Sequence, residues 1–266
     1  MAVKRFASAT ILALALAAGA AGAAVAEPFT VKQISQILFK AAPDSAPDLS
    51  HADLGGLDLS ELDFKGAKLA GADLYGANLA RANLAGADLS GASLDHTIIT
   101  TTNFTGANLE RATLYGAAAY STLDAMKKFE APIFAGANLA GALLMAPLAR
   151  VDFRGANLSH LRTQQGRARL EWILWSDFSG SDFTGGDLSH AELPQARLSF
   201  AKLVNVNLTG ALLAGADLSH ADLTGADLTG AELTGADLDG AILKGVKGLD
   251  QAKGLDAAKN RDRAIY

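Results

Sequence analysis

The chain of 266 residues has no cysteine and few aromatic residues, so alanine and leucine make up most of its apolar half. The absence of cysteine excludes a disulfide framework, a thiolate metal site, a cysteine nucleophile and a lipidated N-terminal cysteine. No acidic residue precedes position 27, and the whole chain carries a net charge of −5. This mildly acidic balance is not that of a nucleic-acid-binding protein, so no nucleic-acid partner is expected.

The first 26 residues have the pattern of a secretory signal peptide. Lys4 and Arg5 form a basic start, residues 7–18 are apolar, and residues 24–26 form a small-x-small cleavage site. The alternative is a membrane anchor, but the apolar run is rich in alanine and glycine, and no stop-transfer charges follow it. We therefore expect cleavage after Ala26, export to the periplasm and no membrane span in the mature chain.

A period of five residues dominates the rest of the sequence. Every fifth residue is apolar from Leu54 to Leu114, and the same spacing returns from Phe178 to Leu243. A small residue, usually alanine, stands two positions before each of these centres, and Asp or Asn often lies between the two. Glycine often stands two positions after the centre. A fixed short period of this kind is typical of repeat architectures.

Neither a helix nor a straight strand can place residues with this period on one buried face. Residues five apart in a helix scatter around its surface, and in a strand they fall on opposite faces. A chain that bends once in every five residues solves the problem, because the centre and the small residue can then both point inward on each short side. Glycine after the centre supports the bend, since it tolerates the backbone angles of a tight turn. Repetition of this bend predicts a solenoid.

The motif A-[DN]-L-x-[GR] occurs here as ADLYG, ANLAR, ANLAG, ADLSG and ADLTG, and it resembles the pentapeptide-repeat family. The resemblance implies an all-β fold, a right-handed quadrilateral β-helix with twenty residues in each coil. On this interpretation residues 49–245 form the β-helix, with about ten coils.

The ends of such a solenoid need caps, because an open β-helix leaves backbone unpaired. Residues 27–48 are expected to cap the N-terminal end with a helix over residues 30–42, for which Thr30 is the N-cap. Residues 246–266 break the period and are predicted to form an irregular last coil and a short helix. Association of two rods through this segment into a homodimer is an alternative that no particular residue supports.

The period fails in three places. Residues 115–133 interrupt it, either as one irregular coil or as a loop that leaves the rod. The spacing of nine residues from Leu144 to Phe153 predicts a register slip near Pro147. Residues 159–175 form a second excursion, which contains both tryptophans and a basic cluster.

This second excursion supplies the candidate partner-binding residues. Arginine beside tryptophan is typical of protein-binding hot spots. The alternative is that the apolar residues of the excursion pack it back onto the rod while its arginines are solvated. The candidate residues are Arg162, Arg167, Arg169, Trp172 and Trp175.

No catalytic, cofactor or metal site is expected from the sequence. A core of leucine and alanine leaves no cavity, and flat outer faces offer no cleft in which titratable groups converge. His160, His190 and His220 recur at intervals of thirty residues. If each interval is one and a half coils, successive histidines lie on opposite sides of the rod and cannot share an ion.

The outward acids of the second repeat run follow an order. Stacking at twenty residues places Arg197 between Asp177 and Asp217, and in the same way it places Lys202 one coil after Asp182. These cations are predicted to relieve repulsion along columns of like charge. Calcium binding to stacked aspartates is the alternative, although carboxylates on flat faces do not enclose an ion.

The leading hypothesis is a non-enzymatic periplasmic scaffold that binds an unknown protein partner through its excursions. The alternative comes from the family resemblance, because some pentapeptide-repeat proteins that confer quinolone resistance mimic DNA and bind DNA gyrase or topoisomerase IV. The signal peptide and the arginine-rich excursion of this chain depart from that group.

Overall fold

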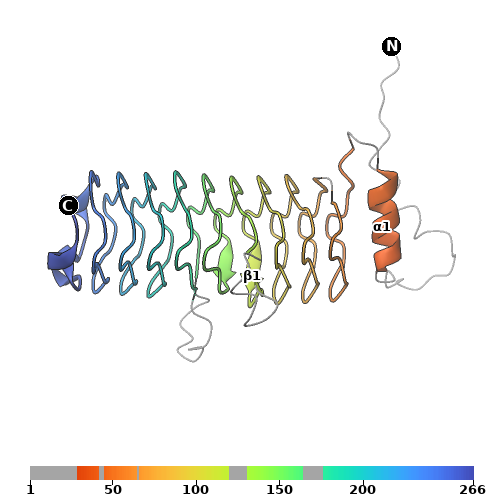
Figure 1. Ribbon diagram of the computed structural model, residues 1–266. Coiled ribbons are helices and arrows are strands. Elements are labelled where there is room, and N and C mark those ends of the chain that lie inside the picture. The colour runs from red at the N-terminus through yellow and green to blue at the C-terminus, as the bar shows by residue number, and fades with distance from the viewer. Residues whose placement is uncertain (1–28, 42–44, 65, 120–130, 164–175) are drawn as a thin grey trace, which may run out of the picture.

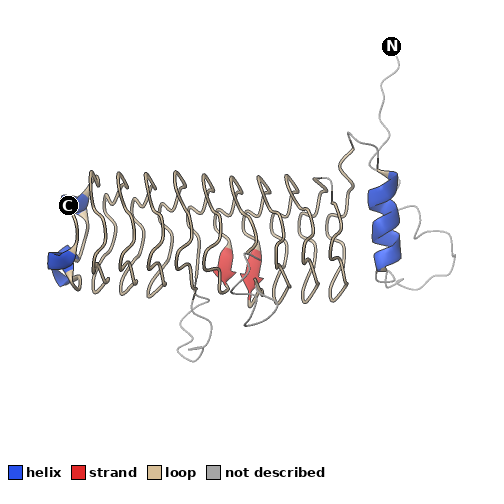
Figure 2. Ribbon diagram, viewed as in Figure 1, coloured by secondary structure: helices blue, strands red, loops and turns tan. Residues whose placement is uncertain are grey.

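The computed structural model describes residues 29–41, 45–64, 66–119, 131–163 and 176–266. They form a rod of stacked coils, with helix α1 (Val31–Lys40) at one end and the C-terminus at the other (Figure 1). Among these residues the only strands are β1 (Thr113–Tyr115) and β2 (Leu143–Met145), which pair in parallel (Figure 2). The predicted all-β class is therefore confirmed only in part. The described rod is mostly non-helical, but its strands are few and form no closed sheet.

Isolated parallel bridges hold neighbouring coils together. Successive bridges at Asp48, Asp53, Asp58 and Asp63 each join a residue to the one twenty positions later. Each coil therefore has four sides, which we number faces 1 to 4 in that order. The bridged column on face 1 consists of residues 48, 68, 88, 108, 138, 157, 187, 207, 227 and 247. Lys247 begins the last coil, outside residues 49–245, so the repeat region has nine coils where about ten were predicted, because the insertions take up the length of one coil.

The same backbone hydrogen bonds recur from one repeat to the next. The Leu69 amide donates to the Asp88 carbonyl of the next coil at 2.6 Å, and the Lys68 amide donates to the Pro47 carbonyl of the preceding coil at 2.8 Å. At the corner the Ala72 amide donates to the Leu69 carbonyl at 3.0 Å. Backbone groups that the stacking removes from water are thus paired, which a buried backbone requires.

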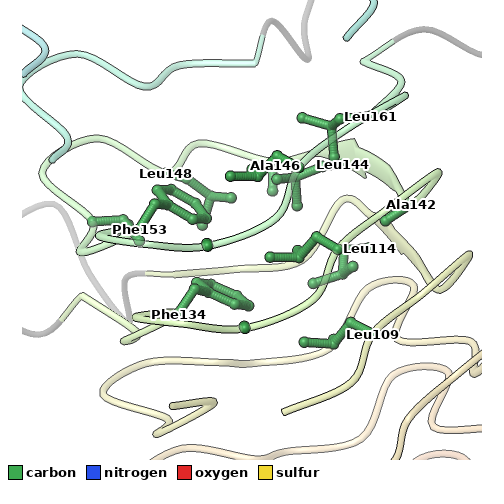
Figure 3. Close-up of a cluster of buried hydrophobic side chains, with 14 of the residues drawn as sticks. Leu109, Leu114, Phe134, Ala142, Leu144, Ala146, Leu148, Phe153 and Leu161 are labelled. Carbon is green, nitrogen blue, oxygen red and sulfur yellow. The ribbon is translucent and has the colours of Figure 1, made fainter. Parts of the chain in front are cut away.

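The core is a continuous column of the two inward positions of each repeat. Leu69 and Ala67 are fully buried, and the equivalent leucines and alanines along the rod are buried in the same way. Phenylalanine replaces leucine at some centres of face 4, where Phe134 stacks on Phe104 with ring centroids 4.8 Å apart and on Phe153 at 5.2 Å. Figure 3 shows Phe134 and Phe153 among the leucines of adjacent coils.

The first interruption is an insertion of ten residues. The bridge spacing rises from 20 between Asn83 and Asn103 to 30 between Asn103 and Ile133. Ala118 lies on face 3 and Ile133 follows on face 4, so the extra residues fall between these two faces. The twenty residues from Leu114 to Phe134 are therefore half a coil plus an insertion and not one irregular coil. Residues 120–130 lie outside the described part of the chain.

The register slip and the second insertion follow. The spacing from Asn138 to Asn157 is 19, so one residue is missing from that coil, and this confirms the predicted slip near Pro147. The spacing from Arg162 to Glu192 is 30. A second insertion of ten residues therefore separates Arg162 on face 2 from Asp177 on face 3.

The N-terminal end of the rod is covered by α1. The Thr30 side chain accepts a hydrogen bond from the Gln33 amide, and the Gln33 side chain accepts one from the Thr30 amide, which makes Thr30 the N-cap of a capping box. Ile34 and Leu38 are buried in the core cluster on one side of the helix. No helix among the described residues is long and apolar enough to cross a membrane.

The C-terminal end is closed by a wider coil. Its bridged residues are Lys247, Lys253, Lys259 and Ile265, so each side has six residues instead of five. The short helix expected here takes the form of three 3₁₀ turns. They are η3 (Leu249–Gln251), η4 (Leu255–Ala257) and η5 (Arg261–Arg263). The leucines of the first two turns are partly buried against the open end of the core.

We expect Phe153→Ala to lower the free energy of unfolding by about 3–5 kcal/mol, because it removes a buried ring from the phenylalanine column and leaves a cavity. Urea unfolding followed by circular dichroism measures the change. Leu212→Ala is the matched control, since Leu212 is exposed on face 2 and its loss should change stability by less than about 0.5 kcal/mol. Equal effects of the two substitutions would show that the core column does not carry the stability.

Candidate protein-interaction surface

The structure describes one of the five candidate partner-binding residues. Arg162 is exposed on face 2, where it bridges Leu143 and Glu192 in the neighbouring coils. The other four, Arg167, Arg169, Trp172 and Trp175, lie outside the described residues, so whether they lie together stays a prediction. The structure does place the two points at which the rod holds this excursion.

Buried hydroxyl groups fix both ends of the second excursion. The Thr163 hydroxyl donates to the Glu192 carbonyl at 2.9 Å, and the Ser176 hydroxyl donates to the Leu144 carbonyl at 2.9 Å. Both side chains are buried. The excursion therefore starts from face 2 and returns to face 3 at firmly held positions.

The two excursions border the same side of the rod. The first begins where face 3 ends, after Ala119, and the second ends where face 3 begins, before Asp177. Because they are inserted at the two edges of face 3, two coils apart, their attachment points flank one side of the molecule. The five-residue phase gives no sign of this, since both insertions are multiples of five.

The Asp and Asn side chains of the motif stabilise the corner that follows them. The Asp217 carboxylate accepts a hydrogen bond from the Ser219 amide at 3.0 Å, and the Asn207 side-chain oxygen accepts one from the Thr209 amide at 3.1 Å. The same bond to the residue two positions later recurs along the rod, and it satisfies a corner amide that the solenoid leaves free. Since Asn makes this bond as well as Asp, the charge of the aspartates is not needed for the turn.

These turn bonds shift the titration of several carboxylates. Hydrogen bonds from Thr229 hold the pKa of Asp227 below its ordinary value, and Thr234 lowers the pKa of Glu232 in the same way. Hydrogen bonds from Ser60 lower the pKa of Asp58. All of these bonds favour the charged form of the carboxyl group.

The predicted interleaving of cations and acids is confirmed. Arg197 is bridged to both Asp177 and Asp217, and Lys202 is bridged to Asp182 in the preceding coil. The Arg197 guanidinium lies 3.9 Å from the Asp177 carboxylate, and the Lys202 ammonium lies 3.5 Å from that of Asp182. Exposed pairs of this kind contribute at most about 1 kcal/mol each, so they adjust the surface charge and do not hold the rod together.

The predicted placement of successive histidines on opposite sides of the rod is wrong for His160 and His190, although it holds for His190 and His220. His160 and His190 lie on the same corner of adjacent coils, with their rings stacked at 5.1 Å and an interplanar angle of 13°. The ten inserted residues between them turn an interval of one and a half coils into one coil. His220 lies on a different corner, where it stacks on Phe200. Among the described residues no three side chains of the His, Asp or Glu type gather around one point that could hold a metal.

Corner side chains fold over glycines of the next coil. His51 has a positive φ of 58°, and its imidazole lies 2.6 Å from the place where a Cβ of Gly71 would be. His190 has the same relation to Gly210, also at 2.6 Å. A larger residue at either glycine would displace the ring. Glycine at these corners is therefore required by the side chain above it as well as by its own φ.

Phe200 is a surface residue that sequence reasoning missed. It stands two positions after a centre, at a corner where the motif has glycine or arginine, and it is exposed. An apolar ring at that position of the repeat is the signal that could have identified it.

Comparison with known proteins gives one family. A family model of pentapeptide repeats, in eight copies, matches residues 48–81, 82–117, 175–210 and 207–245, more than half of the chain. Among solved structures, HetL, a pentapeptide repeat protein involved in heterocyst differentiation regulation from the cyanobacterium Nostoc sp. strain PCC 7120, is 30% identical. The match covers 82% of this chain and 83% of HetL, with a TM-score of 0.34.

Two further solved structures are similar. QnrB1, a plasmid-mediated fluoroquinolone resistance protein, is 17% identical over 74% of this chain and 88% of its own, with a TM-score of 0.45. A pentapeptide repeat protein from the Arabidopsis thaliana thylakoid lumen is 36% identical over 40% of this chain and 63% of its own, with a TM-score of 0.28. A comparison with curated proteins gives no match.

We expect the free energy of unfolding to fall as the pH drops below about 4, the ordinary pKa of Asp in an unfolded chain. The lowered pKa values of Asp58 and Asp227 mean that each charged carboxylate stabilises the folded state above that pH. This stabilisation is lost as the pH falls through the folded pKa.

Urea unfolding between pH 7 and pH 3 measures the effect. Asp58→Asn combined with Asp227→Asn should keep the turn bonds and reduce the loss of stability at low pH. The control is Leu212→Asn, which places the same side chain at an exposed, non-titrating position and should leave the pH profile as it is in the wild type. An unchanged profile in the double variant would contradict this account of the turn carboxylates.

Proposed function

We propose that this chain, which belongs to the pentapeptide-repeat family, is a non-enzymatic scaffold whose rod presents its two excursions to a protein partner. Members of the family are generally scaffold or interaction proteins. We also propose that its coils wind in the right-handed quadrilateral β-helix of the family, and that residues 1–26 direct export to the periplasm.

The arrangement of the attachment points carries the proposal. Both excursions start or end at an edge of face 3, and the second is held by the buried hydroxyls of Thr163 and Ser176. A rigid rod that fixes the ends of two segments at the edges of one face lowers the entropy that is lost on binding a partner. The arginines and tryptophans of the second excursion are residue types that dominate binding energy at protein interfaces.

The acid columns favour a second candidate, a DNA-mimicking modulator of DNA gyrase or topoisomerase IV. Asp and Glu occupy the bridged positions of the coils before and after residues 197–212, and they give the rod regular lines of negative charge. In many repeats Asn makes the same turn bond, so the choice of Asp at these positions adds charge without a gain for the turn.

We expect the natively produced protein to begin at Glu27 and to lie in the periplasmic fraction. Intact mass measurement of the protein from each cell fraction tests this. A cytoplasmic chain that retains residues 1–26 would contradict the export and would favour the topoisomerase candidate.

We expect Trp172→Ser combined with Trp175→Ser to reduce recovery of the partner at least about tenfold in a pull-down from cells that produce the protein, because a hot-spot side chain contributes about 2 kcal/mol or more. Tyr75→Ser is the control, since Tyr75 is an exposed aromatic residue and the nearby Asp73 lies four coils before Arg162 in the bridged column of face 2. Equal recovery by the three proteins would overturn the assignment of binding to this excursion.

A gyrase supercoiling assay separates the two candidates. If the chain is a scaffold, the purified protein does not inhibit supercoiling. If it is a DNA mimic, the wild type inhibits, and replacing aspartates of the columns by asparagine abolishes inhibition while the rod remains folded. The variant for this test changes Asp187, Asp217, Asp222 and Asp227.

A further inference from the structure

Phe200 has a backbone conformation that bulky residues rarely adopt. Its φ is 59°, and every other non-glycine residue with a positive φ in the described part of the chain is polar or charged. This region brings the Cβ atom close to a backbone carbonyl, so it favours glycine and asparagine. Phe200 is also 65% exposed, so burial in the core does not account for it. A strained and exposed aromatic residue is a reason to look for a functional role.

Phe200 lies on a ridge at the corner between faces 3 and 4. We define the ridge as Arg150, Gly180, Phe200 and His220, one residue from each of four successive coils; the amide of each of the first three donates to the carbonyl of the residue that precedes the next member. The Phe200 ring stacks on the His220 imidazole, with centroids 5.0 Å apart and an angle of 20°. The Arg150 side chain lies over Gly180, with its Cγ 3.5 Å from the place of a Cβ there. The ridge thus has a cation at one end and a pair of stacked rings at the other.

Cations also flank Phe200 within its own coil. Arg197 lies on face 3 and Lys202 on face 4, and their side chains are 58% and 64% exposed. The acids that they contact, Asp177 and Asp182, are only 28% and 26% exposed. The positive groups therefore extend further into solvent than the negative groups.

The acids of the next coil are partly occupied by bonds within the rod. Asp217 accepts hydrogen bonds from the amide and hydroxyl of Ser219, and Asp222 accepts the equivalent bonds from Thr224. Both aspartates are half-buried. A molecule that approaches the ridge therefore first contacts an aromatic ring and three cationic side chains.

We infer that the ridge, together with Arg197 and Lys202, is a docking surface for an acidic protein segment that presents an aromatic or leucine side chain. The exposed ring of Phe200 provides the apolar contact, and the flanking cations pair with carboxylates of the segment. An exposed aromatic residue beside arginine is typical of interface hot spots, and complementary charge selects the partner.

This surface adjoins the second excursion. Ser176 ends that excursion, and the next residue, Asp177, is bridged to Arg197 on the coil of Phe200. The inference rests on the proposed function, because it assigns the chemistry of the same protein partner. It adds that the rod itself takes part in binding and does not only hold the excursions.

Phe200→Asn distinguishes this role from a structural one. If the ring is kept for binding, asparagine relieves the backbone conformation and the melting temperature stays the same or rises. If the stack on His220 is a structural support between coils, the melting temperature falls by more than about 4 °C. The latter result would overturn the inference.

A titration with a defined probe tests the binding chemistry. The probe is a labelled peptide of twelve residues with six glutamates around one tryptophan, and fluorescence anisotropy with the full chain measures its Kd. The matched probe has lysine in place of each glutamate. We expect the acidic peptide to bind at least about tenfold more tightly than the basic one, and high salt to weaken it.

Variants of the full chain locate the site. Phe200→Asn should raise the Kd of the acidic peptide at least about fivefold, and Arg197→Ala with Lys202→Ala should do the same. Leu212→Asn is the control, because Leu212 is an exposed apolar residue in the same run of repeats on face 2, and it should leave the Kd unchanged. Equal effects of Phe200→Asn and Leu212→Asn, or equal binding of both peptides, would overturn the inference.

The titration needs no cellular partner, so the two proposals fail separately. If the tryptophan double variant loses the partner in the pull-down but Phe200→Asn retains both partner and peptide, the scaffold function stands and the ridge assignment is wrong. If Phe200→Asn loses the peptide but the wild type recovers no partner from cells, the ridge binds acidic segments and the scaffold proposal is wrong.

Discussion

The stacking of one coil on the next is the constraint on which the rest of this structure depends. A side of five residues has to bury two side chains, bridge both neighbouring coils and turn a corner. Different positions of the motif meet these requirements. Ala67 and Leu69 fill the core, and Lys68 between them forms the bridges. Aspartate or asparagine at the bridging position adds a bond to the corner amide. The outward positions therefore recur at fixed places on the surface of the rod. A substitution at one of them changes the surface chemistry there and leaves the shape of the rod the same.

Much of the fold could be predicted from the sequence, and the reason for the failures is physical. The period identifies the inward positions, and the nine-residue spacing before Phe153 identifies the register slip. Each of the two insertions adds ten residues, a multiple of the period, so the pattern returns in phase but on a different face. The stacking of His160 on His190 could not be found for this reason. The last coil was expected to be irregular because it breaks the five-residue period, whereas the bridges of Lys247 and Lys253 show a regular period of six.

Only part of the candidate site could be predicted. Composition identified the second excursion, and the structure adds the buried hydroxyls of Thr163 and Ser176 that hold its ends. Phe200 could not be selected by propensity, since a single phenylalanine in an apolar-rich sequence suggests the core. Its position two residues after a centre was the available signal, and the structure adds its measured exposure and its positive φ. The rod is thus regular where it stacks, and its irregular residues gather around face 3.

Site-specific photo-crosslinking in living cells tests the central claim most directly, namely that a protein partner contacts this side of the rod. A photoreactive residue is placed at Arg162, at Phe200 or at Lys68, which lies on face 1. The account predicts that positions 162 and 200 crosslink to the same protein and that position 68 does not. Crosslinks that are equally strong from position 68, or different proteins at 162 and 200, would contradict it.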